Sequence, residues 1–165
     1  MRVVYAVIAW IVAGGVVVQA ASIAFGLGGM VHFVQEGGVI DKALVESRQG
    51  SFEGELGFPI HAIVGGGVIP LAALTLVVVS FFVRARGAKL WALVVLGLVV
   101  LQVSLGYSIP DAPWAGLVHG ANALAVLLAA VFAALRIRNA PAVPRRAAGL
   151  HRTADATPNA DAVST

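Results

Sequence analysis

The stretch IHAIVGGGVIPLAALTLVVVSFFV, residues 60–83, decides the fold class. It contains no Asp, Glu, Lys or Arg, and it exceeds the about 20 apolar residues that a helix needs to cross the hydrocarbon core of a bilayer. Three further apolar stretches occupy residues 3–27, 90–107 and 114–135. The sequence therefore predicts an all-α membrane protein, folded as an up-and-down bundle of four transmembrane helices.

The composition of the whole chain agrees with this prediction. Of the 165 residues, 59% are hydrophobic and 12% are charged, whereas soluble domains are about 45–50% apolar and about 25% charged. The mean hydropathy is +0.93. These values exclude a soluble globular domain. The absence of cysteine excludes disulfides, thiolate metal sites, iron–sulfur clusters and covalent haem attachment, so any redox or metal chemistry must use His, carboxylates or a non-covalent cofactor.

The spans predict one transmembrane domain over residues 1–138 and a polar tail over residues 139–165. The tail is rich in Ala, Pro, Thr, Asp and Arg without apolar periodicity, which predicts a disordered cytoplasmic segment. The one sizeable outer loop is expected over residues 28–57, where Asp41 can cap a short helix over residues 42–46. Tight turns are expected over residues 84–89 and 108–113.

The distribution of basic residues predicts the orientation. Of the 11 Lys and Arg residues, nine lie on one side of the predicted spans, and only Lys42 and Arg48 lie on the other. The nine are Arg2, Arg84, Arg86, Lys89, Arg136, Arg138, Arg145, Arg146 and Arg152. The positive-inside rule therefore predicts a multi-pass protein of the cell membrane with both termini in the cytoplasm. Tyr107 and Trp114 are expected at the outer interface.

The first span also has features of a secretory signal peptide. Arg2 precedes an apolar run, and residues 18–20 before Ala21 are similar to a cleavage site. The apolar run continues past Ala21 and exceeds the about 7–15 apolar residues of a typical signal peptide. We therefore expect this span to be retained as a transmembrane helix.

Small residues recur at helical spacing and predict the faces along which helices pack closely, because lipid provides no hydrophobic drive between them. The predicted stripes are Gly15, Gln19, Ser22, Gly26 and Gly29 in the first span, His61, Gly65, Ala72 and Thr75 in the second, and Gly116, His119, Gly120, Ala123, Leu127, Ala130 and Ala134 in the fourth. Two histidines thus belong to inward-facing stripes. Pro70 is expected to bend the second span.

Polar residues inside membrane spans are costly and are candidates for function by default. The spans contain five such residues, which are Gln19, His61, Gln102, His119 and Asn122. The three amides can equally form interhelical hydrogen bonds, each worth about 0.6 kcal/mol on average. His32, at the end of the first span, is expected to be an interfacial side chain.

His61 and His119 are the most informative pair. The second and fourth spans of an up-and-down bundle lie on a diagonal, about 1.4 times the axis spacing of about 8–10 Å, and this gap can hold a porphyrin iron between two imidazoles. His61 lies 23 residues before Arg84 and His119 lies 17 before Arg136, so their depths differ by about 9 Å unless the second helix is tilted or kinked. The pair can be haem ligands, structural or interfacial histidines, or part of another metal site or a proton relay.

Two segments resemble a known family. Residues 101–106 (LQVSLG) and 117–124 (LVHGANAL), joined by a short Pro-containing turn, resemble the third and fourth helices of one half of heme A synthase. Residues 58–61 (FPIH), before a Gly-rich span, resemble its second helix. The resemblance implies a four-helix unit that holds a b-type haem between two histidines, here His61 and His119.

The chain departs from heme A synthase in three respects. That enzyme is twice this size, it has a carboxylate three residues before the second-helix histidine where this chain has Phe58, and many members have an outer-loop cysteine pair. The resemblance therefore does not imply synthase activity. The whole chain is also similar to small bacterial four-helix integral membrane proteins of unknown function, which share Gln on the third helix and His on the second and fourth.

The first functional hypothesis is a small membrane protein that binds a b-type haem near the outer face, for electron transfer or haem handling. His61 and His119 would be the axial ligands. Around them, Gly65 and Gly120 would make room for the ring, and Gln102 or Asn122 would supply second hydrogen bonds, as listed by type in the sequence. Its partner would be another membrane protein or a redox protein.

Two other hypotheses stay open. The protein can be a cofactor-free accessory or scaffold subunit that contacts partners through its outer loop and basic tail. A divalent metal site can form from His32, His61, His119 and either Glu53 or Glu55, which have suitable ligand chemistry without a recognisable spacing. No motif for soluble catalysis is present, and the sparse tail arginines, despite a pI of about 10.0, suit anionic lipid head groups better than nucleic acid.

Overall fold

The computed structural model describes residues 1–47 and 52–139, and in these residues every regular element is a helix. Four helical spans are long and apolar enough to cross a membrane. They are α1 (Arg2–Gln35), a second span made of α3 (Gly57–Ile63), η1 (Val64–Val68) and α4 (Ile69–Ser80), then α5 (Ala88–Ser108) and α6 (Ala115–Asn139). The predicted all-α four-helix bundle is confirmed, and its apolar helices support a multi-pass membrane protein in contact with lipid.

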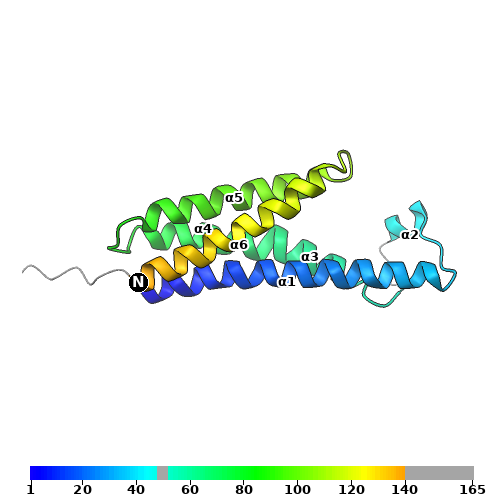
Figure 1. Ribbon diagram of the computed structural model, residues 1–165, viewed down its shortest axis with the longest axis horizontal. Coiled ribbons are helices and arrows are strands. Elements are labelled where there is room, and N and C mark those ends of the chain that lie inside the picture. Colours follow the sequence, from blue (N-terminus) through cyan, green and yellow to red (C-terminus); the bar gives the residue numbers. More distant parts are fainter. Residues whose placement is uncertain (48–51, 140–165) are drawn as a thin grey trace, which may run out of the picture.

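The helices form a ring in chain order (Figure 1). α1 packs against α3, α4 and α6, while α5 packs against α4 and α6. The second span and α6 therefore occupy diagonal corners, as an up-and-down connection requires. Toward the turn between α5 and α6, these two helices diverge from α1 and α3 (Figure 1).

The buried apolar core fills only the half of the bundle nearest the N-terminus. Small residues there let the backbones approach, and larger aliphatic side chains fill the space between them. Its members include Tyr5, Ala9, Val12, Ala73, Leu76, Ala92, Val95, Val99, Val126, Ala130, Ala134 and Ile137. In the other half, where α5 and α6 diverge from α1, the polar residues of the spans meet.

Tyr5 gives this core a polar anchor that the sequence analysis does not predict. Its side chain is 0% exposed, and its hydroxyl donates a hydrogen bond of 2.9 Å to the carbonyl of Ala88. Tyr5 lies in the first turns of α1 and Ala88 begins α5, so the bond joins two helices on opposite corners of the bundle.

α1 is longer than predicted, because residues 28–35 continue the helix instead of starting the outer loop. The segment before α3 packs against this extension: a Cβ at Gly29 would overlap the carbonyl of Glu53, and one at Gly57 would overlap the carbonyl of Ser22. The rings of Phe33 and Phe52 also pack here, 5.6 Å apart. With 34 residues, α1 is about 51 Å long, against a hydrocarbon core of about 30 Å, so it projects beyond the bundle.

The short helix of the outer loop is present as α2 (Lys42–Ser47). The side chain of Asp41 accepts a hydrogen bond of 2.8 Å from the backbone N–H of Leu44, so the predicted N-cap is confirmed. The predicted tail lies outside the described residues except for Asn139, which ends α6 one residue beyond the expected domain boundary.

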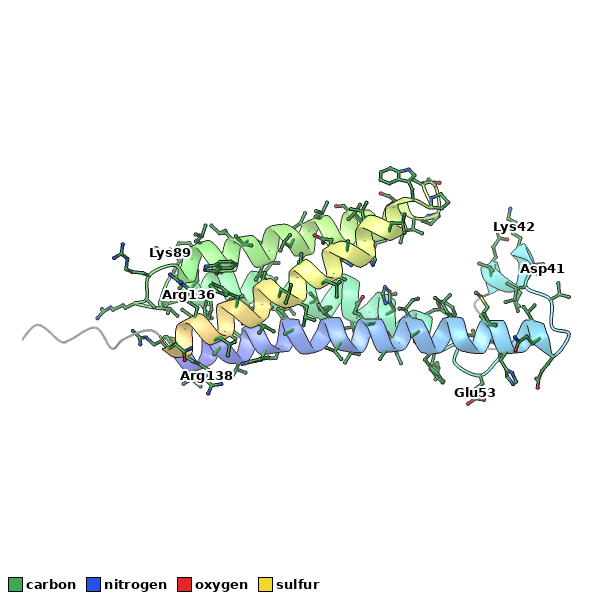
Figure 2. All side chains as sticks on the ribbon, viewed as in Figure 1. Asp41, Lys42, Glu53, Lys89, Arg136 and Arg138 are labelled. Carbon is green, nitrogen blue, oxygen red and sulfur yellow. The ribbon has the colours of Figure 1, made fainter. Side chains whose placement is uncertain are left out.

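Charges separate along the bundle (Figure 2). Lys89, Arg136 and Arg138 lie at the end that holds the N-terminus, and Asp41 and Glu53 lie at the opposite end (Figure 2). All Asp and Glu residues among those described belong to the second end, on the α1 extension, the outer loop or the turn between α5 and α6. This asymmetry is the one on which the predicted orientation depends.

Candidate functional site

The structure brings His61 of α3 and His119 of α6 together. Their ring centres are 6.2 Å apart, and the ring planes are inclined by 48°. The predicted difference in depth is absent, because Arg84 and Arg136 do not mark equivalent helix ends. Ser80 ends the second span 19 residues after His61, and Asn139 ends α6 20 residues after His119.

A π-helical turn follows His61. η1 contains the three consecutive glycines 65–67, and α4 begins at Ile69 with Pro70 in its first turn. Proline has no N–H to donate to the carbonyl four residues earlier, and the wider π turn ends next to it. The break that the sequence predicts at Pro70 is therefore a π turn on its N-terminal side, and π turns inside helices are frequent at functional sites.

His61 is joined to α1 by two hydrogen bonds with Gln19. Its Nδ1 lies 3.1 Å from the backbone carbonyl oxygen of Gln19. In return, Nε2 of the Gln19 side chain donates to the backbone carbonyl of His61 over 2.9 Å. The ring and the backbone of His61 are thus both fixed relative to α1.

His119 is joined to α5 in a related way. Its Nδ1 lies 3.1 Å from the backbone carbonyl oxygen of Gln102. The Gln102 side chain accepts a hydrogen bond of 2.7 Å from Nδ2 of Asn122, which also donates to the carbonyl of Leu98 over 2.9 Å. Asn122 is only 7% exposed, so this amide network lies inside the α5–α6 interface.

The partners fix the tautomer of both rings. A carbonyl oxygen can only accept, so Nδ1 of each histidine must carry the proton and donate it. Nε2 of each neutral ring then keeps its lone pair, and within residues 1–47 and 52–139 neither Nε2 has a hydrogen-bond partner. An imidazole whose Nδ1–H is bound by a carbonyl is the usual form of a histidine that ligates a metal through Nε2.

The two rings line a cavity of about 360 Å³ between α1, α3 and η1 on one side and α5 and α6 on the other. This volume is at the lower end of the about 300–1,000 Å³ of small-molecule sites. None of the described lining residues is acidic, lysine or arginine, and most of the lining is apolar. The lining residues are Gln19, Ile23, His61, Ala62, Gly65, Gly66, Gln102, Val103, Gly106, Tyr107, Ile109, Pro110 and His119.

Two glycines fit tightly against the polar residues. A Cβ at Gly106 would lie 3.2 Å from Cε1 of His119, so Gly106 leaves the imidazole its space. A Cβ at Gly65 would overlap the amide of Gln19. Gly65 lines the cavity, as the sequence analysis expects, but its missing side chain first makes room for Gln19.

The expectation for Gly120 needs correction. This residue is exposed, a Cβ there would meet nothing within 4 Å, and it does not line the cavity. Adjacent positions on a helix differ by about 100°, so when His119 points into the cavity Gly120 points away from it. The buried stripe of α6 instead runs through Ala115, Asn122, Val126, Ala130, Ala133 and Ile137. Thr75 likewise lies on the exposed side of α4.

His32 lies apart from this site, as expected for an interfacial side chain. It is 60% exposed on the α1 extension, where its Nε2 is 3.4 Å from a carboxylate oxygen of Glu36. In the part of the chain that the structure describes, no group of three or more His, Cys, Asp or Glu side chains could hold a metal ion. The divalent site that would combine His32, the histidine pair and Glu53 or Glu55 is therefore not formed.

Sequence reasoning missed part of the site. Gln19 was identified as a polar candidate but not as the partner of His61, and Gly106 and the turn residue Pro110 had no assigned role. The spacing of Gly106, four residues after Gln102 and so on the same helix face, is the signal that could have identified it. Tyr107, expected only at the interface, lines the mouth of the cavity.

No family model, curated protein or solved structure matches this chain. The resemblances to heme A synthase and to small bacterial four-helix proteins therefore stay predictions.

Proposed function

We propose that this chain is a small membrane cytochrome, in which His61 and His119 hold a b-type haem for electron transfer or haem handling. One observation carries the proposal: both rings are anchored through Nδ1, and both keep an unprotonated Nε2 at the same apolar cavity. Each histidine comes from a different helical hairpin, so the two ligands approach from opposite sides of the cavity.

The ring separation supports binding of one metal atom between the imidazoles. With a metal–nitrogen bond of about 2.0–2.1 Å and about 1.1 Å from nitrogen to ring centre, two rings on opposite sides of one metal have centres about 6.3 Å apart. The ring centres of His61 and His119 are 6.2 Å apart. The apolar lining and the bare backbone of Gly66 suit the faces of a flat ring.

The residues around the pair suit its ligand role. A carbonyl that accepts the Nδ1 proton orients an imidazole and raises the basicity of Nε2, and Gln19 and Gln102 provide one such carbonyl each. Asn122 fixes Gln102 in turn. A bound haem iron would supply one-electron chemistry at this place.

The charge asymmetry supports a location in the cell membrane with both termini in the cytoplasm. The histidine pair then lies in the outer half of the bilayer, beyond the buried core. A redox partner or another membrane protein would exchange electrons or haem on that side, where the α1 extension and α2 project.

A second candidate function, a cofactor-free accessory subunit, has one observation in its favour. The same hydrogen bonds that orient the imidazoles also join α1 to α3 and α5 to α6. Polar residues can serve this structural purpose alone in membrane bundles.

Absorption spectroscopy separates the two candidates. The full chain is purified in a mild detergent from cells supplied with a haem precursor, and spectra are recorded oxidised and dithionite-reduced. A Soret band with sharp reduced α and β bands supports the cytochrome, and a parallel metal analysis identifies iron. A spectrum with aromatic absorption alone supports the accessory subunit and overturns the haem proposal.

A further inference from the structure

The two halves of the bundle repeat one arrangement. In each helical hairpin the first helix carries a glutamine and the second carries a histidine, and the histidine Nδ1 lies 3.1 Å from the glutamine backbone carbonyl. The pairs are Gln19 with His61 and Gln102 with His119. The second span and α6 run in the same direction, so the pairs are also equivalent in depth.

The side chains of the two glutamines, however, are used differently. The Gln102 amide is engaged by Asn122, a residue of the same helix as His119. The Gln19 amide instead donates directly to the backbone carbonyl of His61, which already accepts the N–H of Val64 at the start of the π turn. Gln19 therefore acts on the backbone of the histidine itself.

Gly65 shows that the fold accommodates this contact. A Cβ at Gly65 would overlap Nε2 of Gln19 and lie 2.9 Å from its Oε1, so the amide can reach His61 only because position 65 has no side chain. Gly65 and His61 are four residues apart, on the same face of the span. Two positions that otherwise have no reason to depend on each other are thus linked through His61.

We infer that Gln19 is the positioning residue of His61, and that Gly65 is required for this role. The inference rests on the proposed haem site. Without the Gln19 amide, α3 loses one of its two anchors to α1 next to His61, and the ring can turn away from the Gln19 carbonyl. Loss of an outer partner of a metal-ligating histidine typically weakens metal binding about 10- to 100-fold.

The first experiment compares Gln19→Met with Gln35→Met in the haem-loaded full chain. Methionine keeps the length of glutamine but cannot donate, and Gln35 is an exposed position on the same helix. We expect Gln19→Met to lose haem to an apo-globin acceptor about 10- to 100-fold faster. Its ferric low-spin electron paramagnetic resonance signal should also shift in g-values, which report imidazole orientation and would not change through lower stability alone. Gln35→Met should match the wild type in both measurements.

The second experiment is a double-mutant cycle with Gly65→Ala. In the wild type this change displaces the Gln19 amide and should weaken haem retention. In the Gln19→Ala background the space is free, so the effect of Gly65→Ala should be at least about threefold smaller. Equal effects in both backgrounds overturn the inference.

The outcomes also separate this inference from the proposed function. A wild-type protein that binds haem, with an unchanged resonance signal in Gln19→Met, overturns the role of Gln19 alone. A wild-type protein without haem overturns the proposed function and, with it, this role.

Discussion

The imidazole of His61 lies 6.2 Å from that of His119, centre to centre, although their helices occupy diagonal corners of the bundle. Diagonal axes in a square bundle are about 11–14 Å apart, so two inward-pointing side chains span most of that distance and leave room for about one atom between their nitrogens. Because Gln19 and Gln102 bind the Nδ1 atoms, Nε2 is the nitrogen left to each ring for a ligand.

Replacement of either histidine should remove the ligand field of the proposed haem. His61→Ala and His119→Ala should each abolish haem binding or convert the spectrum from six-coordinate low-spin to five-coordinate, because one axial nitrogen is lost. The measurement is the absorption spectrum of the purified variants, normalised to protein content.

His32→Ala is the matched control for these variants. His32 is 60% exposed and pairs only with Glu36 on the same helix, so its loss should leave the spectrum unchanged. If the haem spectrum survives both His61→Ala and His119→Ala, the assignment of the ligands is wrong.

Gln102→Leu should retain the haem but change its redox potential. The backbone carbonyl that accepts the His119 proton remains, whereas the partner of Asn122 is lost. Asn122 keeps its bond to Leu98, so the fold should persist. Potentiometric titration would show a midpoint potential different from that of the wild type. An identical potential would contradict a role of the Gln102–Asn122 network in tuning the site.

The spans, the bundle and the N-cap at Asp41 could be predicted because they depend on local composition and spacing. Helix ends could not, because tertiary contacts decide them. Residues 28–35 read as loop because of their glycines, yet the packing of Glu53 against Gly29 stabilises them as helix. The misplaced inner ends then produced the apparent 9 Å difference in depth between the histidines, by a rise of about 1.5 Å per residue.

Within the site, the sequence identified the polar residues but not their connections. Gly120 was placed beside His119 from the stripe of small residues, which is wide enough to include positions on both sides of the buried face. The contact of Gln19 with His61 depends on the π turn and on the bare backbone of Gly65. Neither follows from the composition of a single helix.

The orientation can be tested with reporter fusions in the described turns. The end with Lys89 and Arg136 should face the cytoplasm, since basic residues are retained there. A fusion after Arg86 should therefore report a cytoplasmic location, and one at Asp111 an external location. An alkaline phosphatase active after Arg86 would reverse the orientation of the bundle.

Tyr5→Phe should destabilise the buried core slightly. The change removes the hydrogen bond of Tyr5 to the Ala88 carbonyl and leaves the ring in place. Hydrogen bonds between membrane helices contribute about 0.6 kcal/mol on average and up to about 1.7 kcal/mol, so the free energy of unfolding in mixed detergent should fall within that range. Tyr107→Phe is the control, since Tyr107 is 78% exposed. Equal losses from both variants would deny the Tyr5 bond its role.

Gly65→Leu should disrupt the bundle far more than Val78→Leu. A side chain at position 65 overlaps the amide of Gln19, so it would separate α1 from the second span and strain or break the contact with His61. Overpacking of this kind costs about 1–3 kcal/mol. Val78 is 59% exposed on the lipid-facing side of α4, and one added methylene there should change stability by less than about 0.5 kcal/mol. The measurement is the fraction of monodisperse folded protein after heating in detergent, and equal losses for the two variants would contradict the assignment of the Gly65 face to the α1 interface.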